Sequence, residues 1–381
     1  MIHTCDVIVI GCGIVGSACA LECARAGMKV TVLEQDTPGS GATAAGMGHI
    51  VVMDDSPAQF ALTSYSQSLW KRLIPELPIN VEYHSCGTIW VAADDEEMSE
   101  GRRKQAYYAA EGLPVEMLDS AQLHEAEPNL DPSLAGGLRV FSDAVLYPPS
   151  AAAYLIQQAQ QHGVSLVYGR CVQASRGEVR LANGTRLQSR IIVNATGAVS
   201  PELTPGILVK KRKGHLIITD RYPGFLNHQL VELGYLKSAH STLGDSVAFN
   251  VQPRKTGQLL IGSSRQYDAE DGGVDHTIVA SMIERAALYM PKLPSLSALR
   301  IWSGFRAATP DKLPLIGPTE DPTLFLATGH EGLGITTSLA TARLLLDHLL
   351  NRPSEIPLTP YLPSRVAATV RDSAADSVAH A

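Results

Sequence analysis

The chain has 381 residues, of which 45% are hydrophobic and 18% charged, a composition that suits a globular protein with a large core. Its 38 acidic and 31 basic residues give a net charge of −7. This mild acidity, without a long Lys/Arg run, argues against nucleic acid as a partner.

The sequence carries no sign of a membrane-spanning or secreted chain. The apolar run at residues 7–21 is too short to cross a bilayer, and the residues before it lack the basic start of a secretory signal. The six cysteines form no CxxC pair, so we expect buried reduced thiols and no metal site. We therefore expect a cytoplasmic protein without a transmembrane segment, with peripheral attachment to the inner membrane face as the alternative.

The first elements in chain order are a strand, a helix and a second strand. The β-branched run Asp6–Ile10 predicts a strand buried on both faces. The small residues of Ile14–Ala26 predict a helix that ends at Gly27, and Lys29–Leu33 predicts a second buried strand. This β-α-β order implies a parallel sheet.

The middle of the chain changes from a mixed pattern to a strand-rich one. Up to residue 206 we expect helices at 59–73, 98–111 and 150–162, and strands at 87–93, 164–168 and 191–195. Residues 207–300 predict an antiparallel sheet outside the nucleotide-binding fold, with strands at 215–219, 246–251 and 258–263 and a helix at 277–290. The last expected elements are a strand at 324–328 and a helix at 335–350.

These elements predict an α/β fold in which an α+β substrate domain is inserted into a discontinuous nucleotide-binding domain. The ranges that we expect for the nucleotide-binding domain are 1–80, 141–206 and 301–363. Those for the substrate domain are 81–140 and 207–300, and residues 364–381 are expected to fray.

A nucleotide is expected at Gly11-Cys12-Gly13-Ile14-Val15-Gly16, which follows a strand and opens a helix. Gly11 permits the tight turn, Gly13 lets the backbone approach a pyrophosphate, and Gly16 lets the helix pack against the strand. The amides at the helix start then point at the phosphates. Glu34, at the end of the second strand, is placed to hold ribose hydroxyls. The alternative is a glycine-rich turn and a solvated glutamate.

Four later segments carry further signals. The last of them joins a buried strand to a long helix and has three glycines within six residues, which suits helix-start amides that face an anion. The structural alternatives for the other three are, in chain order, a surface loop, a core turn and an ion pair between Arg306 and Asp311. The segments are Gly41–Gly48, Asn194–Gly197, Ser303–Gly317 and Gly329–Thr336.

Together with the first glycine motif, these segments resemble the D-amino-acid oxidase family of flavoproteins, which includes glycine oxidase and sarcosine oxidase. The resemblance runs from Cys5 to about Leu350. It implies a Rossmann-like, glutathione-reductase-like domain and non-covalent FAD as the cofactor. It also implies FAD contacts for Gly11, Gly13, Ile14, Val15, Gly16, Glu34, Gln35, Thr43, Ala44, Ala45, Gly46, Met47, Gly48, Val172, Ala195, Thr196, Gly197, Arg306, Gly332, Leu333, Gly334, Ile335 and Thr336.

The resemblance also implies where a substrate binds. Arg306 matches the arginine that grips the substrate carboxylate, for which a planar guanidinium is suited. We expect His49, Glu331 and Tyr235 to line the same pocket. Glu331 stands where glycine oxidase-like proteins usually carry an aromatic residue, and its carboxylate is expected to hold an ammonium, a ring nitrogen or a hydroxyl. A surface histidine, a solvated glutamate and a packed tyrosine are the alternatives.

In the resembled family the α-hydrogen leaves a neutral amine substrate as hydride to the flavin, and the protein fixes orientation and electrostatics. The segments Gly48–Asp55 and Gly329–Gly334 are more similar to the FAD-carrying β subunits of multi-subunit amino-acid dehydrogenases, such as D-hydroxyproline dehydrogenase. The same group includes opine dehydrogenases and hydrogen cyanide synthase. D-Hydroxyproline dehydrogenase is the preferred match, and it implies oxidation of cis-4-hydroxy-D-proline to a cyclic imine carboxylate.

The subfamily also implies partner subunits. The chain has no iron–sulfur cysteine pattern, so any cluster or FMN belongs to a partner. Two alternatives remain: a stand-alone glycine or D-amino-acid oxidase that makes hydrogen peroxide, and a flavin-binding electron-transfer subunit without a substrate of its own.

Overall fold

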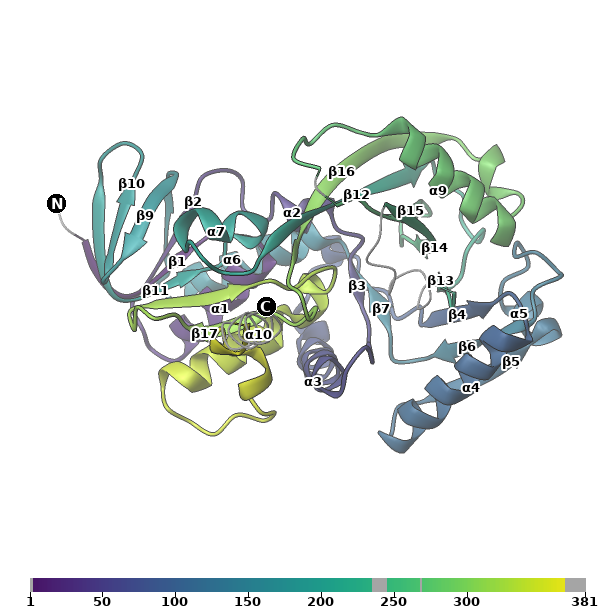
Figure 1. The fold of residues 1–381 in the computed structure, drawn as a ribbon, viewed down its shortest axis with the longest axis horizontal. Coiled ribbons are helices and arrows are strands. Elements are labelled where there is room, and N and C mark those ends of the chain that lie inside the picture. The colour runs from purple at the N-terminus through teal and green to yellow at the C-terminus, as the bar shows by residue number, and fades with distance from the viewer. Residues whose placement is uncertain (1–2, 235–244, 268, 367–381) are drawn as a thin grey trace, which may run out of the picture.

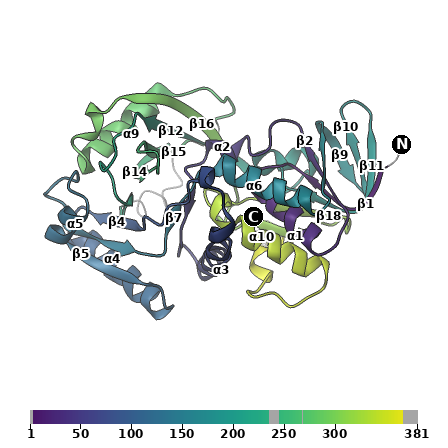
Figure 2. The same ribbon diagram turned by 180° about the vertical axis from the view of Figure 1, so that it is seen from behind.

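A computed structural model describes residues 3–234, 245–267 and 269–366. Two large sheets lie side by side along the long axis of the molecule (Figures 1 and 2), each with its own helices. The expected α/β fold is confirmed.

The first sheet has eight strands and is mostly parallel. Its main path runs β17-β18-β11-β1-β2-β8. Five strands are parallel neighbours: β1 (His3–Ile10), β2 (Val30–Glu34), β8 (Ser165–Tyr168), β11 (Arg186–Asn194) and β18 (Leu324–Thr328). The antiparallel additions are β17 (Leu315–Pro318), β10 (Glu178–Leu181) and β9 (Cys171–Ser175). Segments from the start, middle and end of the chain therefore meet in one sheet.

Four helices pack on this sheet and on one another, around the largest hydrophobic core of the molecule. The core contains small residues of the first helix, such as Ala18 and Ala20, because close helix packing leaves no room for longer side chains. These helices are α1 (Ile14–Arg25), α3 (Pro57–Leu73), α6 (Pro148–Gln161) and α10 (Gly334–Leu349).

The second sheet also has eight strands, and all of its neighbours are antiparallel except β4 and β13. Its order is β16 (Ala298–Ala308), β12 (Lys210–Thr219), β15 (Leu259–Arg265), β14 (Ser246–Pro253), β13 (Gln229–Glu232), β4 (Thr88–Ala92), β6 (Gly136–Val140) and β5 (Val115–Asp119). The helices α4 (Asp95–Ala110), α5 (Ser120–Ala126) and α9 (His276–Tyr289) pack on it.

Several strands of the second sheet were absent from the sequence prediction. The first half of β12 is the basic run Lys210–Lys213, and β16 keeps many half-buried residues because it borders a cavity. Neither segment shows the apolar alternation that predicts a strand. The short strands β5 and β6 and the hairpin of β9 and β10 were missed too.

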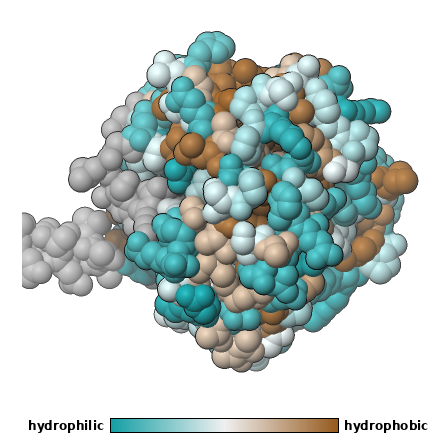
Figure 3. All heavy atoms as spheres, turned by 90° about the vertical axis from the view of Figure 1, so that its right-hand side faces the viewer, coloured by the Kyte–Doolittle hydropathy of each residue, from teal (hydrophilic) through white to brown (hydrophobic). Residues whose placement is uncertain are grey.

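The remaining short elements are α2 (Ala42–Ala45), α7 (Ser200–Leu203), β3 (His49–Ile50), β7 (Ala144–Val145) and the 3-10 turns 74–76, 79–81, 197–199, 293–295 and 359–361. All six cysteines are free thiols. In the described ranges, no helix has the length and apolar character needed to cross a bilayer. On the face shown in Figure 3, hydrophobic residues form small groups among polar ones.

Candidate active site

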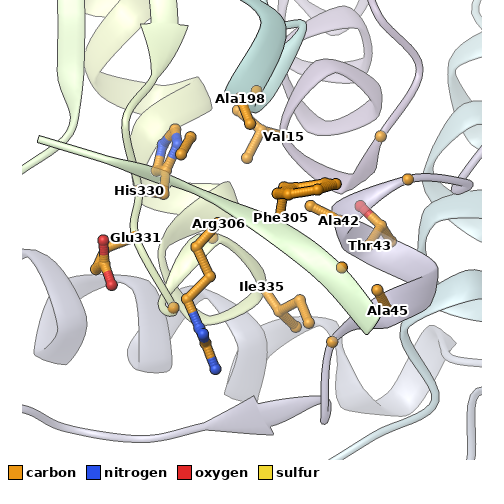
Figure 4. Close-up of a pocket in the computed structure, with 18 of the residues that line it drawn as sticks. Val15, Ala42, Thr43, Ala45, Ala198, Phe305, Arg306, His330, Glu331 and Ile335 are labelled. Carbon is orange, nitrogen blue, oxygen red and sulfur yellow. The ribbon is translucent and has the colours of Figure 1, made fainter. Parts of the chain in front are cut away.

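A cavity of about 630 Å³ lies between the two sheets and receives residues from both. The first sheet and its helices supply the glycine turn, the end of β2 and the start of α10, whereas the second sheet supplies residues of six strands. Figure 4 shows this arrangement around Arg306, with α2 and α10 on neighbouring sides.

The turn before α1 depends on glycine. A Cβ on Gly11 would lie 2.7 Å from the carbonyl oxygen of Ala195, and one on Gly16 would lie 2.0 Å from the carbonyl oxygen of Gly11. Gly11 also has a φ of 98°, which L side chains rarely adopt. Gly16 does not line the cavity; it lets α1 approach β1, and the amides at the start of α1 reach the cavity wall.

Glu34 is fixed at the end of β2. Its Oε2 accepts a hydrogen bond from the amide of Cys12 at 2.6 Å, and its Oε1 accepts one from the amide of Asp36 at 2.9 Å. Only 8% of Glu34 is exposed, yet the residue borders the cavity with Gln35. The carboxylate is therefore oriented before any ligand arrives.

Val172 has a different position from its neighbours. It is 39% exposed on β9, and it is not among the residues that line the cavity, whereas Arg170 and Cys171 are. Ala44, Gly48 and Thr336 also lie outside the lining. Thr336 holds the backbone of the lining residue His49, because its hydroxyl donates a hydrogen bond to the carbonyl of His49 at 2.8 Å.

The segment around α2 is held against the second sheet. A Cβ on Gly304 of β16 would lie 2.3 Å from the Cβ of Ala45, so glycine is required for this approach. Gln252 donates to the carbonyl of Met47 at 2.6 Å, and Trp302 donates to that of Ala45 at 3.3 Å. The segment therefore forms a fixed wall between the two halves of the molecule.

Arg306 points from β16 into the cavity (Figure 4). Its guanidinium lies over Gly214 of β12, and Nη1 donates to the carbonyl of Ser264 on β15 at 2.9 Å. Asp311, which the structural alternative named as an ion-pair partner of Arg306, is paired with Arg365 at 2.7 and 3.0 Å.

Glu331 also lines the cavity, but it already has a cationic partner. Its Oε1 accepts a hydrogen bond from Nη1 of Arg212 at 2.6 Å, while its Oε2 is buried without a partner among the described residues. Arg212 lies on the basic start of β12, which the sequence prediction did not include in a strand. No pattern in the sequence therefore predicts the ion pair between Arg212 and Glu331.

Two histidines of the cavity wall are held neutral. Burial lowers the pKa of His49 to about 4, helped by the nearby Arg306, and lowers that of His330 to about 3. Nε2 of His49 lies 3.2 Å from the carbonyl oxygen of Gly332, and Nε2 of His330 lies 3.0 Å from the hydroxyl of Thr341. Tyr235 lies outside the described residues.

The predicted residues that the cavity does bring together are Gly11, Gly13, Ile14, Val15, Glu34, Gln35, Thr43, Ala45, Gly46, Met47, His49, Ala195, Thr196, Gly197, Arg306, Glu331, Gly332, Leu333, Gly334 and Ile335. The sequence prediction missed the polar residues that the second sheet contributes, among them Thr88, Gln229, Asn250 and Arg265. They stand singly on strands far apart in the chain, so no local motif marks them.

Comparison with protein families gives one match along almost the whole chain. A model of the family described as FAD dependent oxidoreductase, DAO, matches residues 6–348. The hydrogen cyanide synthase subunit HcnC of Pseudomonas aeruginosa is 27% identical, and the match covers 96% of this chain and 97% of that protein. Glycine oxidase of the same organism is 28% identical, with 94% and 98% covered.

Solved structures show the same fold. Glycine oxidase from Geobacillus kaustophilus matches with a TM-score of 0.84 and 26% identity, over 94% of this chain and 98% of that one. L-Proline dehydrogenase from P. horikoshii matches with a TM-score of 0.85 and 23% identity, over 97% and 99%.

Proposed function

Because this chain belongs to the DAO family of FAD-dependent oxidoreductases, we propose that it oxidises cis-4-hydroxy-D-proline to a cyclic imine carboxylate as the catalytic subunit of a multi-subunit dehydrogenase. The chain is an enzyme with FAD as its cofactor, and it oxidises amino or imino acids. The particular substrate and the partner subunits are the proposed part.

The cavity fits FAD in two respects. The glycines at 11 and 16 keep the first turn open where a Cβ would collide with backbone, and the adjoining amides begin a helix of 12 residues. Glu34 is buried and preoriented at the end of β2. We propose that these groups hold the pyrophosphate and a ribose, and that Gly46, Met47 and the start of α10 flank the flavin ring.

The placement of Arg306 is the observation that carries the substrate class. A guanidinium that borders the cavity next to the proposed flavin wall can grip a carboxylate with two parallel hydrogen bonds. Such a grip fixes the α carbon, and FAD, when bound, supplies the acceptor for its hydride. Arg306 therefore selects α-carboxylates and orients them.

The other proposed catalytic residues act on charge and on orientation. His49, with its pKa of about 4, stays neutral at physiological pH and adds no positive charge beside Arg306. Oε1 of Glu331 accepts a hydrogen bond from Arg212, and Oε2, which has no partner among the described residues, can accept one from a substrate ring nitrogen. We keep Tyr235 as a proposed cap of the pocket.

The proposal of partner subunits rests on the relative whose name contains the word subunit, HcnC, of which 97% is covered by the match. Among the described residues, no group of three or more His, Cys, Asp or Glu side chains can hold a metal ion. In this proposal, FMN or iron–sulfur centres belong to the partners.

The glycine oxidase relatives favour a second candidate, a stand-alone oxidase that passes electrons to oxygen. A flavin-binding subunit that only transfers electrons is the third, from another functional class. Both candidates keep the FAD site. They differ from the main proposal in the electron acceptor or in the role of Arg306.

The test is the visible spectrum of the purified protein as cis-4-hydroxy-D-proline is added without oxygen. We expect the flavin band to bleach, and to return slowly when air is admitted. Rapid return with hydrogen peroxide would support the oxidase instead. Bleaching by glycine but not by the hydroxyproline would overturn the proposed substrate.

A matched pair of variants tests the role of Arg306. We expect Arg306→Ala to lower kcat/KM for flavin reduction about 100-fold with FAD retained, because two charge-assisted hydrogen bonds are lost. Arg300→Ala is the control, since Arg300 is an exposed residue of the same strand. Equal reduction rates in the Arg306→Ala variant and the wild type would support the electron-transfer candidate.

A further inference from the structure

Part of the cavity is lined by side chains whose polar atoms have no hydrogen-bond partner among the described residues. Thr88, Trp90, Gln229 and Asn250, which we call the polar floor, all line the cavity. Three of their side-chain atoms are buried without a hydrogen-bond partner among the described residues: Trp90 Nε1, Gln229 Oε1 and Asn250 Oδ1. The hydroxyl of Thr88 lies beside the carboxyl of Asp143. Buried polar atoms are rarely left unpaired, because each costs free energy. Three neighbouring ones indicate a ligand.

The strand register makes the polar floor one continuous surface. Val231 pairs with Asn250 on one side and with Trp90 on the other, and Gln229 pairs with Thr88. Side chains of residues paired in this way point to the same face of a sheet. The floor therefore spans β14, β13 and β4.

The polar floor lies farther along the second sheet than Arg306, the proposed carboxylate-binding residue. Arg306 is tied to the carbonyl of Ser264 on β15, and Asn250 on the next strand pairs with Gly262. With strands about 4.8 Å apart and about 3.3 Å per residue, the backbone of Asn250 lies roughly 8 Å from that of Ser264. A substrate held by Arg306 thus meets the floor with its side chain, past the β carbon.

The chemistry of the floor favours an uncharged ligand group. None of its four side chains is charged. Lys104, which lies 4.6 Å from the centre of the Trp90 ring, is buried and paired with Asp54. The free atoms comprise oxygens that accept and one indole N–H that donates. A hydroxyl or a primary amide satisfies both kinds.

Resting on the proposed function, we propose that the polar floor is a specificity subsite for a hydroxyl or amide on the substrate side chain. Preferred substrates are then amino or imino acids with such a group beyond the β carbon. A site built to hydrogen-bond a substrate group rejects the analogue without it, because its own buried polar atoms would stay unpaired.

The test compares matched substrates by anaerobic flavin reduction: proline with 4-hydroxyproline, and leucine with asparagine, each as D and L isomers. We expect kcat/KM to be at least about tenfold higher for the hydroxylated or amide member of a pair. Equal values within every pair would overturn the inference and leave the proposed function standing. If no amino or imino acid reduced the flavin, the proposed function would fall, and the inference with it.

Variants assign the preference to the floor. Gln229→Met and Asn250→Leu keep the size of the side chain but remove the amide. We expect each to lower kcat/KM about tenfold more for 4-hydroxyproline than for proline. Ser246→Ala, on β14 but outside the cavity, is the control. Retained flavin absorbance shows that a variant is folded, and an unchanged substrate ratio in both floor variants would contradict the assignment.

Discussion

Nη1 of Arg212 lies 2.6 Å from Oε1 of Glu331 at the edge of the cavity, and the side chains are only 13% and 11% exposed. Arg212 comes from β12, whereas Glu331 follows β18 of the other sheet and has a φ of 53°. The amide of Glu331 donates to the carbonyl of Ala307 at 2.9 Å. The pair therefore links the two sheets and neutralises one arginine beside Arg306.

Glu331→Gln should destabilise the protein and change how it binds anions. We expect the free energy of unfolding to fall by about 1–3 kcal/mol, because Arg212 would keep its charge in a nearly buried place. Carboxylate inhibitors should bind about two- to fivefold more tightly, since Arg212 would act on them with Arg306.

The double variant Arg212→Met/Glu331→Gln is the control for this pair. It removes both charges and should recover most of the lost stability. Urea unfolding and inhibitor titration of the flavin spectrum measure the two effects. If the single variant matched the wild type in both, the ion pair would have no role in the charge of the site.

Gly214→Ala should displace Arg306 without touching the cofactor wall. An added Cβ would lie 2.3 Å from Nη1 and 2.8 Å from Cζ of Arg306, so the guanidinium must move. We expect KM for the amino-acid substrate to rise about tenfold, since displacement weakens a charge-assisted contact, while bound FAD is retained. Steady-state kinetics and the flavin spectrum measure this.

Gly272→Ala is the matched control, because a Cβ there meets nothing within 4 Å and the φ of Gly272 lies outside the range of +20° to +160° that L side chains rarely adopt. It should leave KM unchanged. An unchanged KM in Gly214→Ala would mean that the guanidinium does not need the space over β12.

Glu34→Gln should weaken FAD binding about tenfold. The substitution keeps an oxygen for the amide of Cys12 but removes the charge that strengthens hydrogen bonds from a ribose. Titration of FAD into the apoprotein, followed by quenching of flavin fluorescence, gives the dissociation constant. Glu178→Gln should have no effect, because Glu178 is a half-buried residue of β10 outside the cavity, 3.6 Å from Arg186. Equal affinity in both variants would contradict a ribose-binding role for Glu34.

Much of the first half of the site could be predicted because its signals are local. The glycines at 11, 13 and 16 and Glu34 lie on one strand–helix–strand unit, so spacing alone brings them to one edge of the sheet. Arg306 was found from a segment that resembles a family, not from a strand pattern. The described structure places it on a strand that the pattern did not predict.

The second half of the site escaped prediction because its residues meet only through strand pairing. Gln229 and Asn250 are single amides, and they reach the cavity because β13 and β14 pair in a particular register. Arg212 lies in a basic run that gives no strand signal. A shift of one residue would turn these side chains to the other face of the sheet, and register is decided by the whole core.

Asp143 should make the stability of the protein depend on pH in an unusual direction. Burial raises the pKa of this carboxyl from 3.8 to about 7 in the folded protein. Between these values the unfolded chain has lost a proton that the folded protein keeps. The contribution of Asp143 to the free energy of unfolding is therefore fully present below about pH 4 and is lost as pH rises through 7. The free energy of unfolding falls by at most about 1.4 kcal/mol per pH unit from this cause.

Asp143→Asn should remove this dependence, since an amide does not ionise but still offers an oxygen to the Val52 amide and to Gln67, which donate at 3.2 and 3.0 Å. We expect the free energy of unfolding, measured in urea from pH 5 to 8, to fall less steeply with pH in the variant than in the wild type. Asp131→Asn is the control: Ser133 lowers the pKa of Asp131, so this carboxyl is ionised in both states over the whole range. Parallel slopes for Asp143→Asn and the wild type would mean that Asp143 ionises in the folded protein as readily as in the unfolded chain.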